Sequence, residues 1–226
     1  MLMTFFVVVL VLSNIASSAK IVDLGFSVFT IRMAFDGGTL LFPLAYVFGD
    51  ILTEVYGFRA ARRVIWTGFA ALAFSSLVFF VLRLLPGESS WEAQISAANT
   101  GSVNTGAAGS AAYNVILGGM SSGGLVLASL AGYLTGEFSN AMLLSKIKAL
   151  MKGRLFWFRA IVSSLVGELL DSLVFISIAC ATGVFGWNLF LSLVFTNYIL
   201  KCLIEALVLP VTSTAVRRLK KSENAP

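Results

Sequence analysis

The stretch that decides the fold is Phe42 to Trp66, FPLAYVFGDILTEVYGFRAARRVIW. It is an apolar, helix-length segment that carries two carboxylates, Asp50 and Glu54, in its second half and then meets a basic turn. The segment is so apolar that we expect it to lie in lipid, where a carboxylate is costly and marks a functional site with a partner. Because Asp50 and Glu54 are four residues apart, they share one helix face, which we expect to look inward.

Composition places the chain among membrane proteins. Of its 226 residues, 58% are hydrophobic and 12% are charged, about half the charged fraction of soluble domains. The net charge of +5 comes from basic residues in short connections, which indicates topology signals and no nucleic-acid binding. The absence of histidine excludes imidazole relays, Ser-His triads and histidine-based zinc sites. Cys180 and Cys202 lie in apolar runs and are interpreted as packing residues, so no metal or cofactor is expected.

Six apolar runs predict an all-α integral membrane protein that forms a single domain over residues 1–226. The predicted transmembrane helices are 2–19, 39–56, 61–85, 114–144, 156–182 and 187–208. The first run ends on Ser17-Ser18-Ala19, which resembles a signal-peptidase site. Its start lacks the positive charge of a signal peptide, so we interpret the run as a helix.

The connections between these helices predict the topology. Residues 20–38 are too short and too polar to span, which favours a short hairpin or re-entrant segment between the first two helices. The Gly- and Ser-rich stretch 86–113 is expected to be a flexible loop, and 211–226 a basic tail. Basic residues collect in the second and fourth connections and in the tail. This asymmetry predicts that both termini are cytoplasmic.

Carboxylates outnumber cations inside the predicted membrane core. The acidic side chains are Asp50, Glu54, Glu137, Glu168, Asp171 and Glu205. The basic ones are Lys201 and, nearer the interface, Arg159. The deficit of about four cations must be met by protonation, by a bound cation, or by a ligand rich in hydrogen-bond donors.

Polar residues recur at helical spacing on several predicted helices, so that their stripes could meet around one cavity. The stripes are Glu168 with Asp171, Asn197 with Lys201 and Glu205, Glu137 with Asn140, and Asn14 on the first helix. Structural interpretations stay open, because Lys201 and Glu205 could form an intrahelical ion pair and Arg159 could reach headgroups. The pairs Asp50–Glu54 and Glu168–Asp171 have no basic partner within one turn toward the helix interior, which favours a functional role.

The most distinctive segments are FPLAYVFGDILTEVYGFRAARRVIW, ASLAGYLTGEFSNAMLLSKIK and GRLFWFRAIVSSLVGELLDSLVF, followed by a helix with Asn197, Lys201 and Glu205 and then a proline. In this order they resemble the queuosine precursor transporter family, also called vitamin uptake transporters. The resemblance covers nearly the whole chain, from about Asn14 to Pro210. The loop 86–113 looks expanded relative to that family.

The resemblance implies a multi-pass importer of 7-deazaguanine compounds (preQ0, preQ1 or queuine) in the bacterial inner membrane, and no enzyme. Such a base presents adjacent N–H donors, for which a carboxylate is a natural bidentate acceptor. We expect substrate or proton contacts from Asp50, Glu54, Glu168 and Asp171, with Asn197 and Lys201 orienting them. The remaining candidates are Glu137, Asn140, Arg159, Glu205 and Asn14.

The expected mechanism is secondary transport by alternating access, with protons linked through one of the carboxylates. The sequence contains no Walker motif and is not expected to hydrolyse ATP. Its partners are the deazapurine and the lipid bilayer, and six helices could form a complete unit or half of a homodimer. One alternative is a substrate-binding subunit that is energised by a separate ATPase module. Another is an intramembrane enzyme, which the lack of suitable motifs and histidines disfavours.

Overall fold

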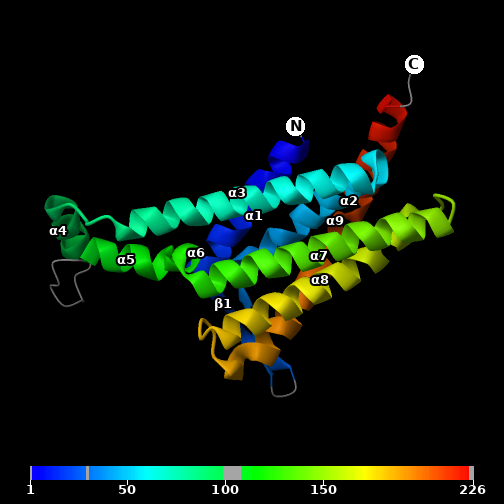
Figure 1. The fold of residues 1–226 in the computed structure, drawn as a ribbon. Coiled ribbons are helices and arrows are strands. Elements are labelled where there is room, and N and C mark those ends of the chain that lie inside the picture. Colours follow the sequence, from blue (N-terminus) through cyan, green and yellow to red (C-terminus); the bar gives the residue numbers. More distant parts are fainter. Residues whose placement is uncertain (1, 29–30, 99–107, 224–226) are drawn as a thin grey trace.

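The structure, a computed structural model, describes residues 2–28, 31–98 and 108–223. Most of this chain is helical. The elements are α1 (Leu2–Ala19), β1 (Ile21–Val28), β2 (Ile31–Asp36), η1 (Gly37–Leu40), α2 (Phe42–Tyr56), α3 (Phe58–Leu84), α4 (Ser89–Ala98), α5 (Ala108–Ile116), α6 (Gly118–Ser121), α7 (Gly123–Leu150), α8 (Phe156–Ala181), η2 (Trp187–Leu189) and α9 (Phe190–Glu223). Helices α4 and α5 lie at one end of the molecule, and the α2–α3 and α7–α8 turns lie at the other (Figure 1).

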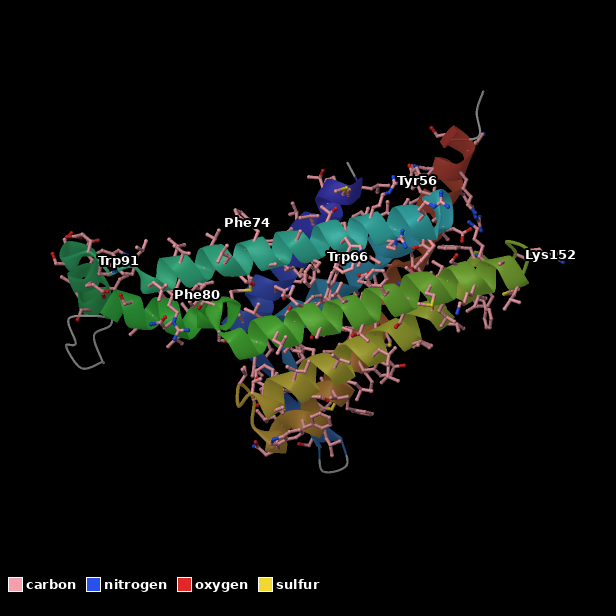
Figure 2. The ribbon with its side chains drawn as sticks, in the orientation of Figure 1. Tyr56, Trp66, Phe74, Phe80, Trp91 and Lys152 are labelled. Atoms are coloured by element: carbon pink, nitrogen blue, oxygen red, sulfur yellow. The ribbon has the colours of Figure 1, made fainter. Side chains whose placement is uncertain are left out.

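The end with these two turns is called the basic end. Its basic residues are Arg59, Arg62, Arg63, Lys146, Lys148, Lys152 and Arg154. Lys152 at this end and Trp91 on α4 mark the two extremes of the molecule in Figure 2. Leu2 of α1 packs against an apolar cluster formed by Val47 and Ile51 of α2 and Val216 of α9.

Four helices in the described part of the chain are long and apolar enough to cross a bilayer. They are Leu2–Ala19, Phe58–Leu84, Phe156–Ala181 and Trp187–Ser222, the last of which joins η2 to α9. Large apolar side chains of α3 such as Phe74 and Phe80 point outward (Figure 2). Phe74 is 67% exposed, which suits contact with lipid and not with water. A mostly helical membrane protein is therefore confirmed, while the predicted spans at α2 and α7 remain predictions.

The segment predicted to be a flexible loop contains helices instead. Its described residues form α4 and the start of α5, and residues 99–107 lie outside the described ranges. The first turn of α4 is held by Glu88, whose carboxylate accepts hydrogen bonds from Ser90 and from the backbone N–H of Trp91. These bonds, led by that from the Ser90 hydroxyl, lower the pKa of Glu88 to about 2. An acidic cap of this kind stabilises a helix N-terminus.

Two other boundaries differ from the prediction. Helix α9 continues through Pro210 to Glu223, so most of the expected tail is helical. The predicted helix 114–144 is divided into α5, α6 and α7. The last break lies at Ser122, which has extended backbone angles and accepts a hydrogen bond from the N–H of Leu125 as the N-cap of α7.

The stretch between α1 and α2 forms two antiparallel strands. Their register runs from Ile21 opposite Asp36 to Val28 opposite Ile31, with an irregularity near Gly25, which has a positive φ of 76°. Strand β2 packs on α9, and Met33 and Phe35 are buried. Strand β2 therefore forms part of the packed core, whereas most residues of β1 are exposed.

Helices α7 and α8 approach each other through glycine, which shapes the interior. A Cβ atom added at Gly136 would lie 3.0 Å from the carbonyl oxygen of Gly167, and one added at Gly167 would lie 2.9 Å from that of Gly136. Small residues permit such close contact between membrane helices. The Tyr46 side chain from α2 reaches this crossing and contacts both glycine positions. Polar groups of three helices are thereby brought into one layer.

Candidate functional site

Buried polar side chains run along the facing sides of α2, α7, α8 and α9 and continue to the end of β2 and to η1. These residues are Asp36, Thr39, Asp50, Thr53, Glu54, Glu137, Asn140, Arg159, Ser163, Ser164, Glu168, Asp171, Ser172, Asn197, Lys201 and Glu205. Each exposes less than a tenth of its surface. Burial of so many polar groups is costly unless they are paired or serve a ligand. Their partners therefore indicate what each one does.

At the basic end, Glu54 is surrounded by cations from three helices. Arg159 Nη1 lies 2.8 Å from Glu54 Oε2, and Lys148 Nζ lies 3.6 Å from Oε1. Lys220 of α9 also pairs with Oε1. Glu54 and Arg159 are both fully buried. The partners of Glu54 thus come from other helices and not from the neighbouring turns of α2, and Arg159 does not reach outward to headgroups.

One turn farther inside, Asp50 joins α2 to α7 and α8. The amide of Asn140 donates to Asp50 Oδ1 at 2.8 Å. The hydroxyl of Ser164 lies 3.5 Å from Asp50 Oδ2 and 3.5 Å from Asn140 Oδ1. A serine hydroxyl has one hydrogen to donate, so Ser164 can serve only one of these acceptors at a time. Asp50 is thus held by neutral groups and makes no ion pair among the described residues.

Glu137 on α7 is the most exceptional group of the interior. It is 1% exposed, and both carboxylate oxygens lack a hydrogen-bond partner. Its Oε2 lies against Gly49 of α2, where an added Cβ atom would be 2.9 Å away. The hydroxyl of Tyr46 is also buried without a partner. Unsatisfied buried polar groups are rare and call for an explanation, such as a ligand that satisfies them in another state.

The cation of this interior, Lys201, is bound to Asp171. Lys201 Nζ lies 2.5 Å from Asp171 Oδ2 and 4.9 Å from the ring centroid of Phe42. The alternative of an intrahelical pair between Lys201 and Glu205 is not what the structure shows. Since Lys201 serves Asp171, four buried carboxylates on α2, α7, α8 and α9 make no ion pair within the described residues. These are Asp50, Glu137, Glu168 and Glu205.

Glu168 and Glu205 face each other between α8 and α9. Their carboxylates lie within reach of one another and line the same small cavity of about 30 Å³. The thiol of Cys202 lies 3.1 Å from Glu168 Oε2 and can donate to it. One oxygen of each glutamate is buried without a hydrogen-bond partner.

Two predicted amides lie apart from the buried carboxylates just described. Asn197 donates to Asp36 Oδ2 at 2.7 Å, and Asp36 also caps η1 by accepting from the N–H of Gly38. Asn197 therefore joins α9 to the end of β2. Asn14 on α1 accepts from Ser129 and lines a separate cavity of about 10 Å³.

The central group thus contains most of the predicted site residues. They are Asp50, Glu137, Asn140, Glu168, Asp171, Lys201 and Glu205. Prediction from the sequence missed Tyr46 and Asp36. Tyr46 lies four residues before Asp50 on the same helix face, and this spacing could have revealed it. Asp36 precedes two glycines, a pattern typical of a turn. Within the described residues, no three His, Cys, Asp or Glu side chains form a metal-ligand group.

Comparison with known proteins identifies relatives of the chain. Residues 36–215 match the family described as "Putative vitamin uptake transporter". A protein of Bacillus subtilis (strain 168), described as "Probable queuosine precursor transporter", is 23% identical over 189 residues, which cover 83% of this chain and 74% of that protein. No solved structure matches significantly. The region matched by the family includes the central group and, of the ion cluster at the basic end, Glu54, Lys148 and Arg159. The match confirms the resemblance drawn from the sequence.

Proposed function

Because the chain belongs to the vitamin uptake transporter family, we propose that it imports queuosine precursors across a bacterial inner membrane. The substrates are 7-deazaguanine bases such as preQ0 and preQ1, with queuine as a further candidate. The description of the Bacillus subtilis relative supports this substrate class. The chemistry of the central group supports it independently.

The observation that carries the proposal is the unpartnered carboxylate of Glu137 beside the Asp50–Asn140 pair. The ring N–H and the exocyclic amine of a deazaguanine point in the same direction, so that one carboxylate accepts both. The carbonyl oxygen of the base then accepts from a neutral donor, for which the Asn140 amide and the Tyr46 hydroxyl are available. A carboxylate-rich site would repel anionic solutes.

Access to this group requires helix movement, because Asp50, Glu137 and Asn140 are each 1% exposed. On one side the Glu54 ion cluster ties α2, α7, α8 and α9 together. On the other side the Asp36–Asn197 bond ties β2 to α9. We assign these two layers as alternately opening gates of a secondary transporter with six spans and cytoplasmic termini. The basic end would face the cytoplasm.

The test is direct binding of preQ1, preQ0, queuine and guanine to purified protein, measured by calorimetry. We expect micromolar-range binding of at least one deazaguanine, weakened in Asp50→Asn. The matched control is Glu88→Gln, which replaces a carboxylate outside the bundle. Absence of binding for all four bases would overturn the substrate class, while equal binding by Asp50→Asn would overturn the site.

The mode of energisation needs a second experiment. Proteoliposomes that contain the isolated chain should accumulate the bound base without ATP, as expected of a secondary transporter. Accumulation only after an ATPase module and ATP are added would instead favour the alternative of a substrate-binding subunit.

A further inference from the structure

The geometry points to Glu168 and Glu205 as the proton-binding site that drives transport, separate from the groups that contact the base. The pair is proposed to hold one shared proton, taken up on the outer side and released on the cytoplasmic side in each cycle. This inference rests on the proposed function and adds to it the ion and the residues that carry it.

Two ionised carboxylates in contact repel each other, and burial increases the cost. Glu168 is fully buried and Glu205 is 5% exposed. The cation whose charge reaches Glu168 is Lys201, and its ammonium group is bound to Asp171 at 2.5 Å. One proton between the two carboxylates removes one negative charge and lets one glutamate donate a hydrogen bond to the other. The pair therefore favours a shared proton over two separate charges.

Other titratable groups face the pair from the surrounding helices. They are Tyr46 and Asp50 on α2, Glu137 on α7, Asp171 on α8, and Tyr198, Lys201 and Cys202 on α9. Apart from Lys201 they are acids, and all of them lie within the described residues. The surrounding acids therefore oppose ionisation of both glutamates and favour the binding of a proton.

Ser164 connects the pair with the base-binding group. Its hydroxyl lies 3.5 Å from Asp50 Oδ2 and also within reach of Glu205. Because the hydroxyl donates to one acceptor at a time, a base that occupies Asp50 frees Ser164 for Glu205. Ionised Glu205 would hold that hydroxyl more strongly than the protonated pair. Occupation of the base site and the charge of the pair are thus linked through a single hydrogen.

The pair also lines a cavity that can hold water. Glu168 and Glu205 line the cavity between α8 and α9, which is otherwise lined by Ile161, Leu165, Cys202 and Ala206. Its volume of about 30 Å³ suits a water molecule and not a purine base. The cavity size therefore favours a proton site over a second substrate site.

The first test needs no transported solute. Infrared difference spectra of purified protein at neutral and alkaline pH report the carbonyl stretch of protonated carboxylic acids. We expect one such band to be lost in Glu168→Gln and in Glu205→Gln, because the new amide donates the hydrogen that the shared proton supplied. Glu88→Gln should keep the band. A spectrum that neither pair variant changes would overturn the shared proton.

The second test measures coupling in proteoliposomes that contain a pH-sensitive dye. The solute is preQ0, which has no aminomethyl group to carry a proton of its own. Wild-type protein should admit a proton with each preQ0, while Glu168→Gln should carry preQ0 down its gradient without protons. Proton entry that persists in this variant, or loss of all preQ0 flux in both single variants, would overturn the coupling role. If wild-type protein carries no deazaguanine at all, the proposed substrate fails, and the infrared result still decides the proton site.

Discussion

Glu54 and Glu137 are both fully enclosed, but their neighbours give them different roles. Glu54 is paired with three cations, whereas neither oxygen of Glu137 has a partner. A carboxylate whose oxygens are paired connects helices, whereas one without partners is available to a ligand. Neutralising Glu137 and breaking the ion pairs of Glu54 should therefore have opposite effects on the stability of the protein.

Replacing Glu137 with glutamine should weaken binding of the deazaguanine by about 10- to 100-fold, because a charge-assisted bidentate contact becomes a weaker neutral one. Calorimetry with the best base of the binding panel measures the change. The folded protein should keep or gain thermal stability, since an unpaired buried charge is removed. Unchanged affinity in a folded Glu137→Gln protein would contradict the assignment of Glu137 to the base.

Replacing Arg159 with methionine should destabilise the protein by about 3 kcal/mol, because Glu54 would lose its buried cation. The additional change Glu54→Gln should restore part of the loss, since the stranded charge is then absent. Thermal unfolding in detergent measures both variants. The matched control is Arg154→Met, which changes an exposed arginine of the same turn. Equal stability of Arg159→Met and Arg154→Met would show that the ion cluster is not a structural connection.

At the scale of elements, the crossing of α7 and α8 positions the central group. Gly136 and Gly167 bring the two backbones together, and Asn140 and Asp171 lie one turn from Gly136 and Gly167 respectively on their helices. Tyr46 fills the space at the crossing. The positions of these side chains therefore depend on the close contact of the two backbones, which requires glycine on both helices.

Gly136→Ala should destabilise the protein by about 1–3 kcal/mol, the usual cost of overpacking a close contact. The added methyl group would meet the Tyr46 hydroxyl and lie 2.7 Å from Asp171 Cβ. Gly123→Ala, at the start of the same helix, meets nothing within 4 Å and should be neutral or slightly stabilising. Thermal unfolding compares the two. A fully stable Gly136→Ala protein that also binds the base normally would contradict the packing argument.

At the scale of the whole molecule, the distribution of charge predicts orientation in the membrane. The basic end carries the arginines and lysines of two turns, and the opposite end carries α4 with Glu88 and Glu92. The Lys220 side chain at the end of α9 pairs with Glu54, so the last helix returns to the basic end. The positive-inside rule then predicts that the C-terminus is cytoplasmic.

A fluorescent protein fused to the C-terminus should fluoresce, because that reporter folds in the cytoplasm. Alkaline phosphatase inserted after Gly87 should be active, because that enzyme requires the outer compartment. The reciprocal fusions serve as controls and should both be silent. An active phosphatase at the C-terminus would reverse the proposed orientation and, with it, the assignment of the two gates.

The sequence by itself determined the membrane class, the family and most of the residues at the central group. The apolar runs determine the class because a charged group inside lipid is so costly that the few present stand out. Helical periodicity then fixes which residues share a face, and so Asp50, Glu137, Asn140 and Asp171 could be selected before their neighbours were known.

Only the tertiary structure decided which buried charges are partners. The cations of Glu54 lie 94, 105 and 166 residues away along the chain, and Lys201 pairs across helices with Asp171 and not along its own helix with Glu205. Periodicity fixes the direction of a side chain within its helix. It does not fix the rotation, depth and crossing of that helix against its neighbours, which follow from contacts such as Gly136 against Gly167. Those contacts separate the ion cluster around Glu54 from the buried carboxylates of α2, α7, α8 and α9 that make no ion pair within the described residues.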